Sequence, residues 1–185
     1  IHKIIKEDHQ HHNIVNITRN LTEKDFSLNF KKLLNKSEEI LSRKLCLKVK
    51  ELNKIHLQIR INRPKSLDIN PPHKDGYLSY WRDIINIWVP IESCNKDTSL
   101  PIIPGSHLWR ENEIYRTSNK GSTINGNKYM VPCILKLRDK ELKMIRPNPK
   151  QGDAIFFTPF LIHGAAFNKS NHTRIAMELR FSKYG

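Results

Sequence analysis

The sequence predicts a mainly β domain, built as a double sheet or barrel, with a helical layer on its N-terminal side. Two observations lead to this fold class. Helical periodicity is confined to residues 22–46, whereas later segments show short strand-like runs separated by turn signals. Strands do not alternate regularly with helices, which argues against a parallel βαβ fold. The 185 residues are expected to form a single domain, residues 1–185.

The N-terminal part divides into two segments. Residues 1–20 are polar with little periodicity, and we expect a mobile terminus in which His9, His11 and His12 cluster by composition. Residues 22–46 open with Thr22-Glu23-Lys24-Asp25, which resembles a capping box with Asp in place of Glu or Gln. Apolar residues then recur every three or four positions. This pattern predicts one amphipathic helix whose apolar stripe packs on a sheet.

The rest of the chain reads as strands and turns. Residues 55–61 alternate between apolar and polar side chains until Pro64, and residues 84–91 are nearly all apolar, as in a strand buried on both faces. Further strands are predicted at residues 100–103, 134–137, 142–145, 154–158 and 173–181. Residues 109–130 are polar and contain Gly121 and Gly126, which predicts a long excursion and a candidate lid loop.

The overall composition limits the classes of partner and the cellular location that we expect. The formal net charge of +14 invites nucleic-acid binding. The Lys and Arg residues are nevertheless spread along the chain without a recognisable nucleic-acid module, and a solvated basic surface or attraction to an anionic small substrate explains the charge equally well. No run approaches the ~18 apolar residues of a membrane span. Neither a signal peptide nor a disulfide framework is apparent, because Cys46, Cys94 and Cys133 are odd in number and far apart. We therefore expect a cytoplasmic location.

The candidate chemistry lies in His73-Lys74-Asp75 and the distant His163. On an extended segment, His73 and Asp75 point to the same side of the chain and can share one ion. His163, which follows a strand-like run, would complete the set from another strand end. Two imidazoles and one carboxylate suit non-haem Fe(II) and leave coordination positions open. Lys74 should point away from the ion, since two cations repel each other.

Three stretches then resemble the phytanoyl-CoA dioxygenase family of Fe(II)/2-oxoglutarate oxygenases: PPHKDGYLSYW, INIWVPIESCNKDTSLPIIPGSHLW and PKQGDAIFFTPFLIHGAAFNKSNHTRIAMELRF. The resemblance covers residues 55–110 and 147–182. It implies a double-stranded β-helix, or jelly roll, with Fe(II) as metal and 2-oxoglutarate and O2 as co-substrates. It also implies that His73, Asp75 and His163 bind iron, and that Arg174 pairs with the distal carboxylate of 2-oxoglutarate through its planar guanidinium.

Other assignments are less specific. The resemblance suggests Gln58 and Trp88 as co-substrate contacts, although ordinary strand roles explain them equally well. Arg180 shares the strand parity of Arg174 and is an alternative anchor. Substrate contacts are expected from aromatic and nearby side chains and from the 111–130 loop, although such aromatics are as often core residues; the candidates are Tyr77, Tyr80, Trp81, His107 and Trp109.

The resulting hypothesis is hydroxylation of a small substrate, for which the charge favours an anionic or carrier-linked molecule, with release of succinate and CO2. The ligand Asp75 favours hydroxylation, because related halogenases carry Gly or Ala at that position. Departures from the family at Ala165 and at residues 96–99 bear on secondary contacts and loop shape. Two alternatives stay open: a cupin-like metal-binding protein without 2-oxoglutarate chemistry, and a basic binding module on a vestigial oxygenase fold.

Overall fold

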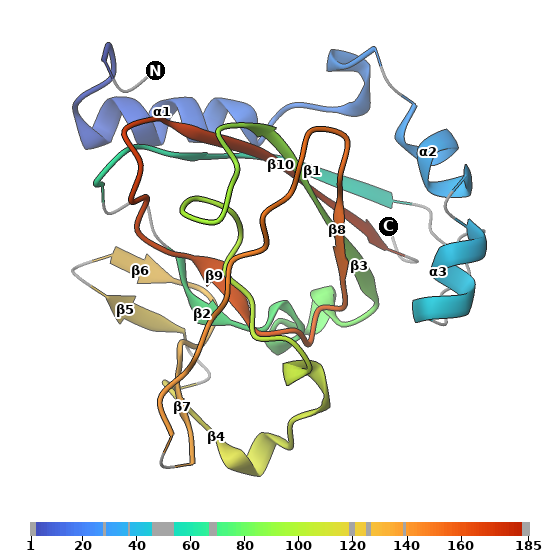
Figure 1. The fold of residues 1–185 in the computed structure, drawn as a ribbon, viewed down its shortest axis with the longest axis vertical. Helices are drawn as coiled ribbons and strands as arrows, with labels where there is room; N and C mark the ends of the chain where they lie inside the picture. Colours follow the sequence, from blue (N-terminus) through green and yellow to red (C-terminus); the bar gives the residue numbers. More distant parts are fainter. Residues whose placement is uncertain are drawn as a thin grey trace.

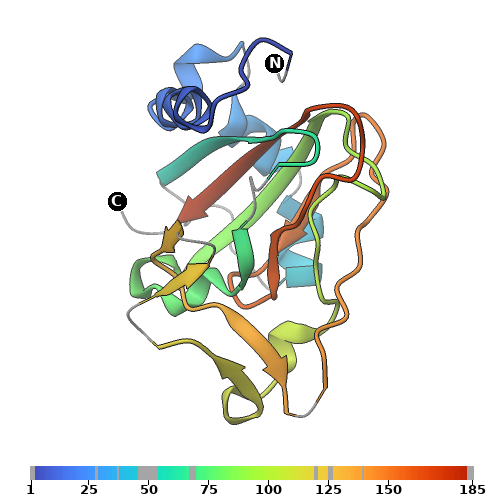
Figure 2. The same ribbon diagram turned by 90° about the vertical axis from the view of Figure 1, so that its left-hand side faces the viewer.

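The structure, a computed structural model, describes residues 3–27, 29–36, 38–45, 54–66, 70–118, 121–124, 127–138 and 140–182. Figures 1 and 2 show the path of the chain, with the N-terminal helices on one side of the strands. The elements are α1 (Asp8–Thr18), η1 (Glu23–Asp25), α2 (Phe30–Lys36), α3 (Glu38–Leu45), β1 (Lys54–Asn62), β2 (Asn70–His73), η3 (Asp75–Tyr77), η4 (Ser79–Trp81), β3 (Ile84–Glu92), η5 (Ser106–Leu108), η6 (Glu111–Glu113), β4 (Ile114–Arg116), β5 (Ser122–Ile124), β6 (Asn127–Tyr129), β7 (Ile134–Leu137), β8 (Ile155–Phe157), β9 (His163–Ala165) and β10 (Arg174–Ser182).

The principal sheet has four antiparallel strands in the order β1-β10-β3-β8. The central strand β10 pairs with β1 over its whole length, from Lys54 opposite Ser182 to Asn62 opposite Arg174. Three smaller antiparallel pairs, β2-β9, β4-β7 and β5-β6, complete the strands of the described residues. The prediction of a mainly β fold is therefore confirmed, and so are the strands at 55–61, 84–91 and 173–181.

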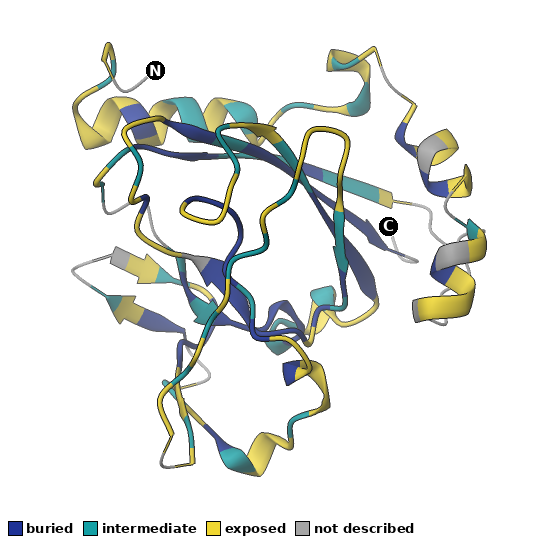
Figure 3. Ribbon diagram, viewed as in Figure 1, coloured by how far each residue is buried: buried dark blue, intermediate teal, exposed yellow. Residues whose placement is uncertain are grey.

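The two faces of this sheet differ in chemistry because side chains alternate along each strand. On β10, Met177, Leu179 and Phe181 face α2 and α3 and pack with Phe30 and Leu41 of these helices. The opposite face of the same strand carries Arg174, Glu178 and Arg180, all of them buried. Figure 3 shows the central strands buried and the helices exposed on their outer surface. The strand thus separates an apolar core from a buried polar interior.

The predicted single helix at 22–46 is wrong. The capping box is present, since the backbone N–H of Thr22 donates to Asp25 Oδ2 at 2.7 Å. It starts only the short turn η1, however, and the chain becomes helical again at Phe30, whose N–H donates to Glu23 Oε1 at 2.7 Å. Asn29 Oδ1 accepts from the backbone N–H of Lys32 at 2.7 Å and caps this new helix, so the apolar stripe is carried by α2 and α3. Cys46, the predicted helix end, lies outside the described residues.

The expected mobile terminus is also wrong for residues 8–18, which form α1. This helix lies against β1 (Figure 1). The carboxylate of Asp8 pairs with Arg63 at 2.6 Å, and His11 is buried. A long-range ion pair and one buried side chain therefore order a segment whose own periodicity is weak.

The second half is less regular than expected. Instead of strands, residues 100–103 and 142–145 contribute isolated bridges, in which Ile102 pairs with both Ile145 and His163. Residues 109–130 do leave the principal sheet, but they contain η6 and the strands β4, β5 and β6. Residues 119–120 and 125–126 lie outside the described part. Within the described ranges, no helix is long and apolar enough to cross a membrane.

Candidate metal and co-substrate site

A close approach of two short strands assembles the candidate site. β2 and β9 pair so that His73 lies opposite His163. The next residue, Gly164, is needed there, because a Cβ atom at this position would lie only 2.7 Å from the carbonyl oxygen of Asn70. Asp75 follows His73 after one extended residue and begins η3. The spacing of His73 and Asp75 places both side chains beside the histidine of the second strand.

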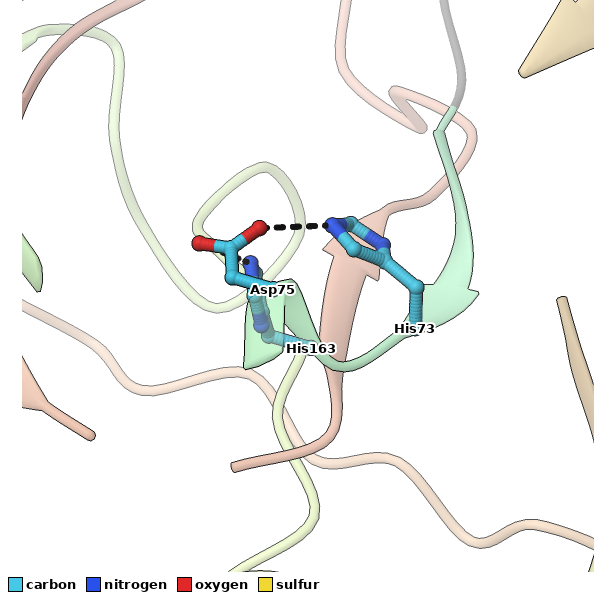
Figure 4. Close-up of side chains that lie close together, drawn as sticks. All are labelled: His73, Asp75 and His163. Atoms are coloured by element: carbon cyan, nitrogen blue, oxygen red, sulfur yellow. Dashed lines mark ion pairs between the residues drawn. The ribbon is translucent and has the colours of Figure 1, made fainter. Parts of the chain in front are cut away.

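The three side chains form a compact, buried cluster (Figure 4). His73 Nε2 lies 3.4 Å from Asp75 Oδ1, and His163 Nε2 lies 3.9 Å from Asp75 Oδ2. One ligand atom from each residue lies within 4.8 Å of the others. Metal–ligand bonds of roughly 2.1 Å at right angles place neighbouring ligand atoms about 3 Å apart. A small contraction of the cluster would therefore fit one octahedral ion.

Backbone carbonyls orient both imidazoles. His73 Nδ1 lies 2.7 Å from the Pro71 oxygen, and His163 Nδ1 lies 3.1 Å from the Leu161 oxygen. A carbonyl oxygen only accepts hydrogen bonds, so each Nδ1 carries the proton and each Nε2 presents its lone pair to the cluster. Burial, aided by His73, lowers the pKa of His163 to about 4. The His163 imidazole is therefore neutral near pH 7, as a metal-binding imidazole must be.

Two donors hold the Asp75 carboxylate. Asn86 Nδ2 donates to Asp75 Oδ2 at 3.0 Å, and Arg180 Nε donates to the same oxygen at 3.3 Å. Burial would raise the pKa of the Asp75 carboxyl, but Arg180 and the two histidines outweigh this effect and hold that pKa well below its usual range. Asp75 is thus ionised, as a metal ligand must be.

A buried ion-pair network extends from this carboxylate. Arg180 donates to Glu178 Oε1 at 2.7 Å, and Arg60 Nε donates to Glu178 Oε2 at 2.5 Å. Burial opposes ionisation of Glu178, yet the two guanidinium groups lower its pKa to about 2. Sequence reasoning missed the roles of Asn86, Arg60 and Glu178. Two signals were available: Asn86 interrupts the apolar run 84–91, and Glu178 has the strand parity of Arg174.

Arg174 lies beside the histidine cluster at a small cavity of about 40 Å³, lined by Arg60, Asn70, Trp88, Leu100, His163, Gly164, Arg174 and Glu178. Its side chain is buried, and its Nε has no hydrogen-bond partner among the described residues. Burial lowers the pKa of Arg174 to about 10, which leaves it charged at neutral pH. Its Cζ lies 5.9 Å from the centre of the Trp88 ring. A buried cation with a free donor can take an anionic partner.

The other residues predicted to contact the co-substrate or the substrate lie in different parts of the structure. Gln58 and Trp88 both lie opposite Glu178 in the sheet, so they share its polar face. Tyr80 and Trp81 line an open cleft of about 330 Å³. The Trp81 ring lies 5.1 Å from the Arg180 guanidinium, which also contacts Asp75, so Arg180 separates this cleft from the cluster.

The other three predicted substrate side chains have different surroundings. Tyr77 and Trp109 pack against a separate apolar cluster around Ile103, and His107 is exposed. As predicted, Lys74 is directed elsewhere, because its ammonium pairs with Glu111 at 2.7 Å. Of the predicted substrate residues, Tyr80 and Trp81 border a cleft next to the site.

Known proteins with a similar structure or sequence were compared with this chain. A crystal structure of EvdO2 from Micromonospora carbonacea var. aurantiaca is similar at 18% identity and a TM-score of 0.57, over 80% of this chain and 58% of that chain. A Pseudomonas putida prolyl-4-hydroxylase is similar at 11% identity and a TM-score of 0.46, over 84% of this chain and 65% of that one. No protein of curated function matches. The likeness to EvdO2 shows a shared fold. Residues 2–176 match the family model described as phytanoyl-CoA dioxygenase, and this chain therefore belongs to that family.

Proposed function

We propose that this chain is an Fe(II)/2-oxoglutarate-dependent dioxygenase that hydroxylates a small substrate on a double-stranded β-helix. The observation that carries the proposal is the buried cluster of His73, Asp75 and His163. Both histidines present Nε2 because their Nδ1 atoms lie at backbone carbonyls. This donor set is the one that suits non-haem Fe(II) with open positions. The chain spans 58% of the length of the EvdO2 chain that it resembles.

Each side chain has a defined part in this proposal. His73, Asp75 and His163 hold the iron, Arg174 pairs with the distal carboxylate of 2-oxoglutarate, and Trp88 forms a wall of the same cavity. Bound iron, 2-oxoglutarate and O2 would supply the oxidation, with release of succinate and CO2. Because Asp75 is present as a ligand, hydroxylation is favoured over halogenation.

The cavity beside Arg174 is too small to hold 2-oxoglutarate as it stands. Its volume of about 40 Å³ is far below the ~300–1,000 Å³ of ordinary ligand pockets. Binding a five-carbon diacid therefore requires neighbouring side chains to move. Arg60 is the best candidate, since its side chain is 31% exposed at the edge of the network. The same observation supports a second candidate function, a cupin-like metal-binding protein that does not use 2-oxoglutarate.

The substrate is proposed only as a class. The net charge of +14 supports a small anionic or carrier-linked molecule. Gln58 as a co-substrate contact, Tyr80 and Trp81 as substrate contacts, residues 109–130 as a lid, and a cytoplasmic location all stay predictions.

The test is an anaerobic titration of the protein with Fe(II), followed by 2-oxoglutarate. We expect one Fe(II) per chain and then a weak visible charge-transfer band when 2-oxoglutarate joins the iron. Asp75→Ala should abolish iron retention, because it removes the only anionic ligand of the cluster. Asp97→Ala, which removes an exposed carboxylate from a loop, is the matched control and should bind iron normally.

The same titration separates the alternatives. Iron binding without the band would favour the cupin-like protein. Failure to bind iron would favour a basic binding module on this fold. A panel of small molecules, scored by succinate release, would then identify the substrate of an active oxygenase.

A further inference from the structure

We propose that Asn86 and Arg180 are positioning residues that make Asp75 a ligand through one oxygen only. They hold Oδ2 by hydrogen bonds and leave Oδ1 for the metal. This inference rests on the proposed function, in which His73, Asp75 and His163 bind one ion, and it assigns a task to two side chains outside that set.

The hydrogen bonds distinguish the two carboxylate oxygens. Oδ2 accepts from Asn86 Nδ2 at 3.0 Å and from Arg180 Nε at 3.3 Å. Each carboxylate oxygen has about two lone-pair sites, so two donors saturate Oδ2. Oδ1 accepts no such donor and faces Nε2 of His73 at 3.4 Å, while Nε2 of His163 lies 3.9 Å from the saturated Oδ2. The lone pairs left for an ion are therefore those of Oδ1.

The two donors occupy adjacent, buried positions of the sheet. Asn86 on β3 lies directly opposite Arg180 on β10, so both reach Asp75 from adjacent positions on one face of the sheet. Asn86 is fully buried, and Arg180 is 7% exposed. Glu178 holds the far end of the Arg180 guanidinium at 2.7 Å and is held in turn by Arg60. Such supporting contacts fix the orientation of a ligand carboxylate.

The consequence concerns open coordination positions. Two histidines and a carboxylate bound through one oxygen occupy three positions of an octahedral ion and leave three. The proposed co-substrate would take two of them, which would leave one for O2. If Oδ2 were free to rotate onto the ion, Asp75 would occupy a fourth position. Asn86 and Arg180 thus keep one position available for O2.

The experiment measures how many water molecules are bound to Mn(II) in the site. Mn(II) is the probe because it favours oxygen and imidazole ligands. The proteins compared are the wild type, Asn86→Ala, and Asn86→Ala combined with Arg180→Lys. The lysine keeps the positive charge, but its single ammonium does not reproduce the planar fork that serves Asp75 and Glu178 together. Loss of one of three bound waters should lower the water-proton relaxation enhancement per bound Mn(II) by about one third in the double variant, and by less in the single variant. The relaxation is compared per bound Mn(II) at saturation, because loss of support for a ligand can also weaken metal binding by about 10- to 100-fold.

Asn168→Ala is the structural control. Asn168 is as buried as Asn86, but it donates to the backbone oxygens of Asn62 and His172, away from the ligand set. This variant should lower the unfolding temperature and leave the relaxation per bound ion unchanged. If the Asn86→Ala protein and the double variant both bind Mn(II) with wild-type relaxation, or lose affinity only in step with stability, the positioning role is wrong. A wild-type protein that binds neither Mn(II) nor Fe(II) would instead overturn the metal site and, with it, this role.

Discussion

Replacing Gly164 with Ala tests how closely β2 and β9 must approach to build the cluster. A Cβ atom at this position would lie 2.7 Å from Asn70 O and 3.1 Å from Pro71 O, whereas ordinary contacts begin at 3.4 Å. The strands would therefore have to separate by about 0.7 Å, which exceeds the ~0.5 Å within which functional side chains must be held. Because His73 and His163 pair across these two strands, the ligand atoms would separate as well.

The expected result is a fall in Fe(II) affinity of at least about tenfold, the lower end of the range seen when support of metal ligands is lost. Overpacking should also lower the free energy of unfolding by about 1–3 kcal/mol. Anaerobic calorimetric titration measures the first quantity, and urea unfolding of the metal-free protein measures the second.

Gly152→Ala supplies the matched control. A Cβ atom at Gly152 meets nothing within 4 Å, but the backbone φ of +91° disfavours a side chain. This variant should lose stability and retain Fe(II) affinity. Wild-type iron binding by Gly164→Ala, or an equal loss of affinity in both variants, would refute the reasoning.

Three further predictions follow from the buried charges. Arg174→Gln should weaken 2-oxoglutarate binding to the iron-loaded protein by roughly 10- to 100-fold, because a charged hydrogen bond contributes about 1.5–3 kcal/mol. Its Fe(II) affinity should equal that of the wild type. If this variant binds 2-oxoglutarate as tightly as the wild type does, Arg174 does not hold the co-substrate. Glu178→Gln removes the carboxylate that Arg60 and Arg180 share and should lower the free energy of unfolding on the order of 3 kcal/mol in urea, whereas wild-type stability would contradict the network. The third prediction concerns pH: the pKa of His163 falls from 6.5 to about 4 on folding, so the unfolded chain binds the extra proton between these values. Stability of the metal-free protein should therefore decline as the pH drops from 6.5 toward 4, and His163→Gln should reduce that slope in urea titrations at several pH values.

Local patterns were sufficient for part of this molecule. The alternation of residues 55–61 and the apolar run 84–91 identified β1 and β3, since a strand buried on one or both faces has a distinctive period. His73 and Asp75 could be recognised as a pair because two residues of extended chain place their side chains together. The family followed from the order of these motifs, and the match over residues 2–176 confirms it.

Other features depend on partners that are distant in the sequence. α1 packs against β1 and pairs with Arg63 through Asp8, 55 residues earlier. Such a contact leaves no periodic signal. The interruption of the predicted long helix is local, since Asn29 caps α2. The single domain of residues 1–185 and a lid at 109–130 stay predictions.

By itself, the sequence determined the mainly β class, the ligand types and the family, because these depend on residue identity and local spacing. Only the tertiary structure decided which atoms are available for chemistry. The pairing of β2 with β9 brings His163 to Asp75, and the pairing of β3 with β10 brings Asn86 and Arg180 to one oxygen of that carboxylate. The physical reason is that periodicity reports whether a side chain is buried, whereas strand register decides which group it meets there.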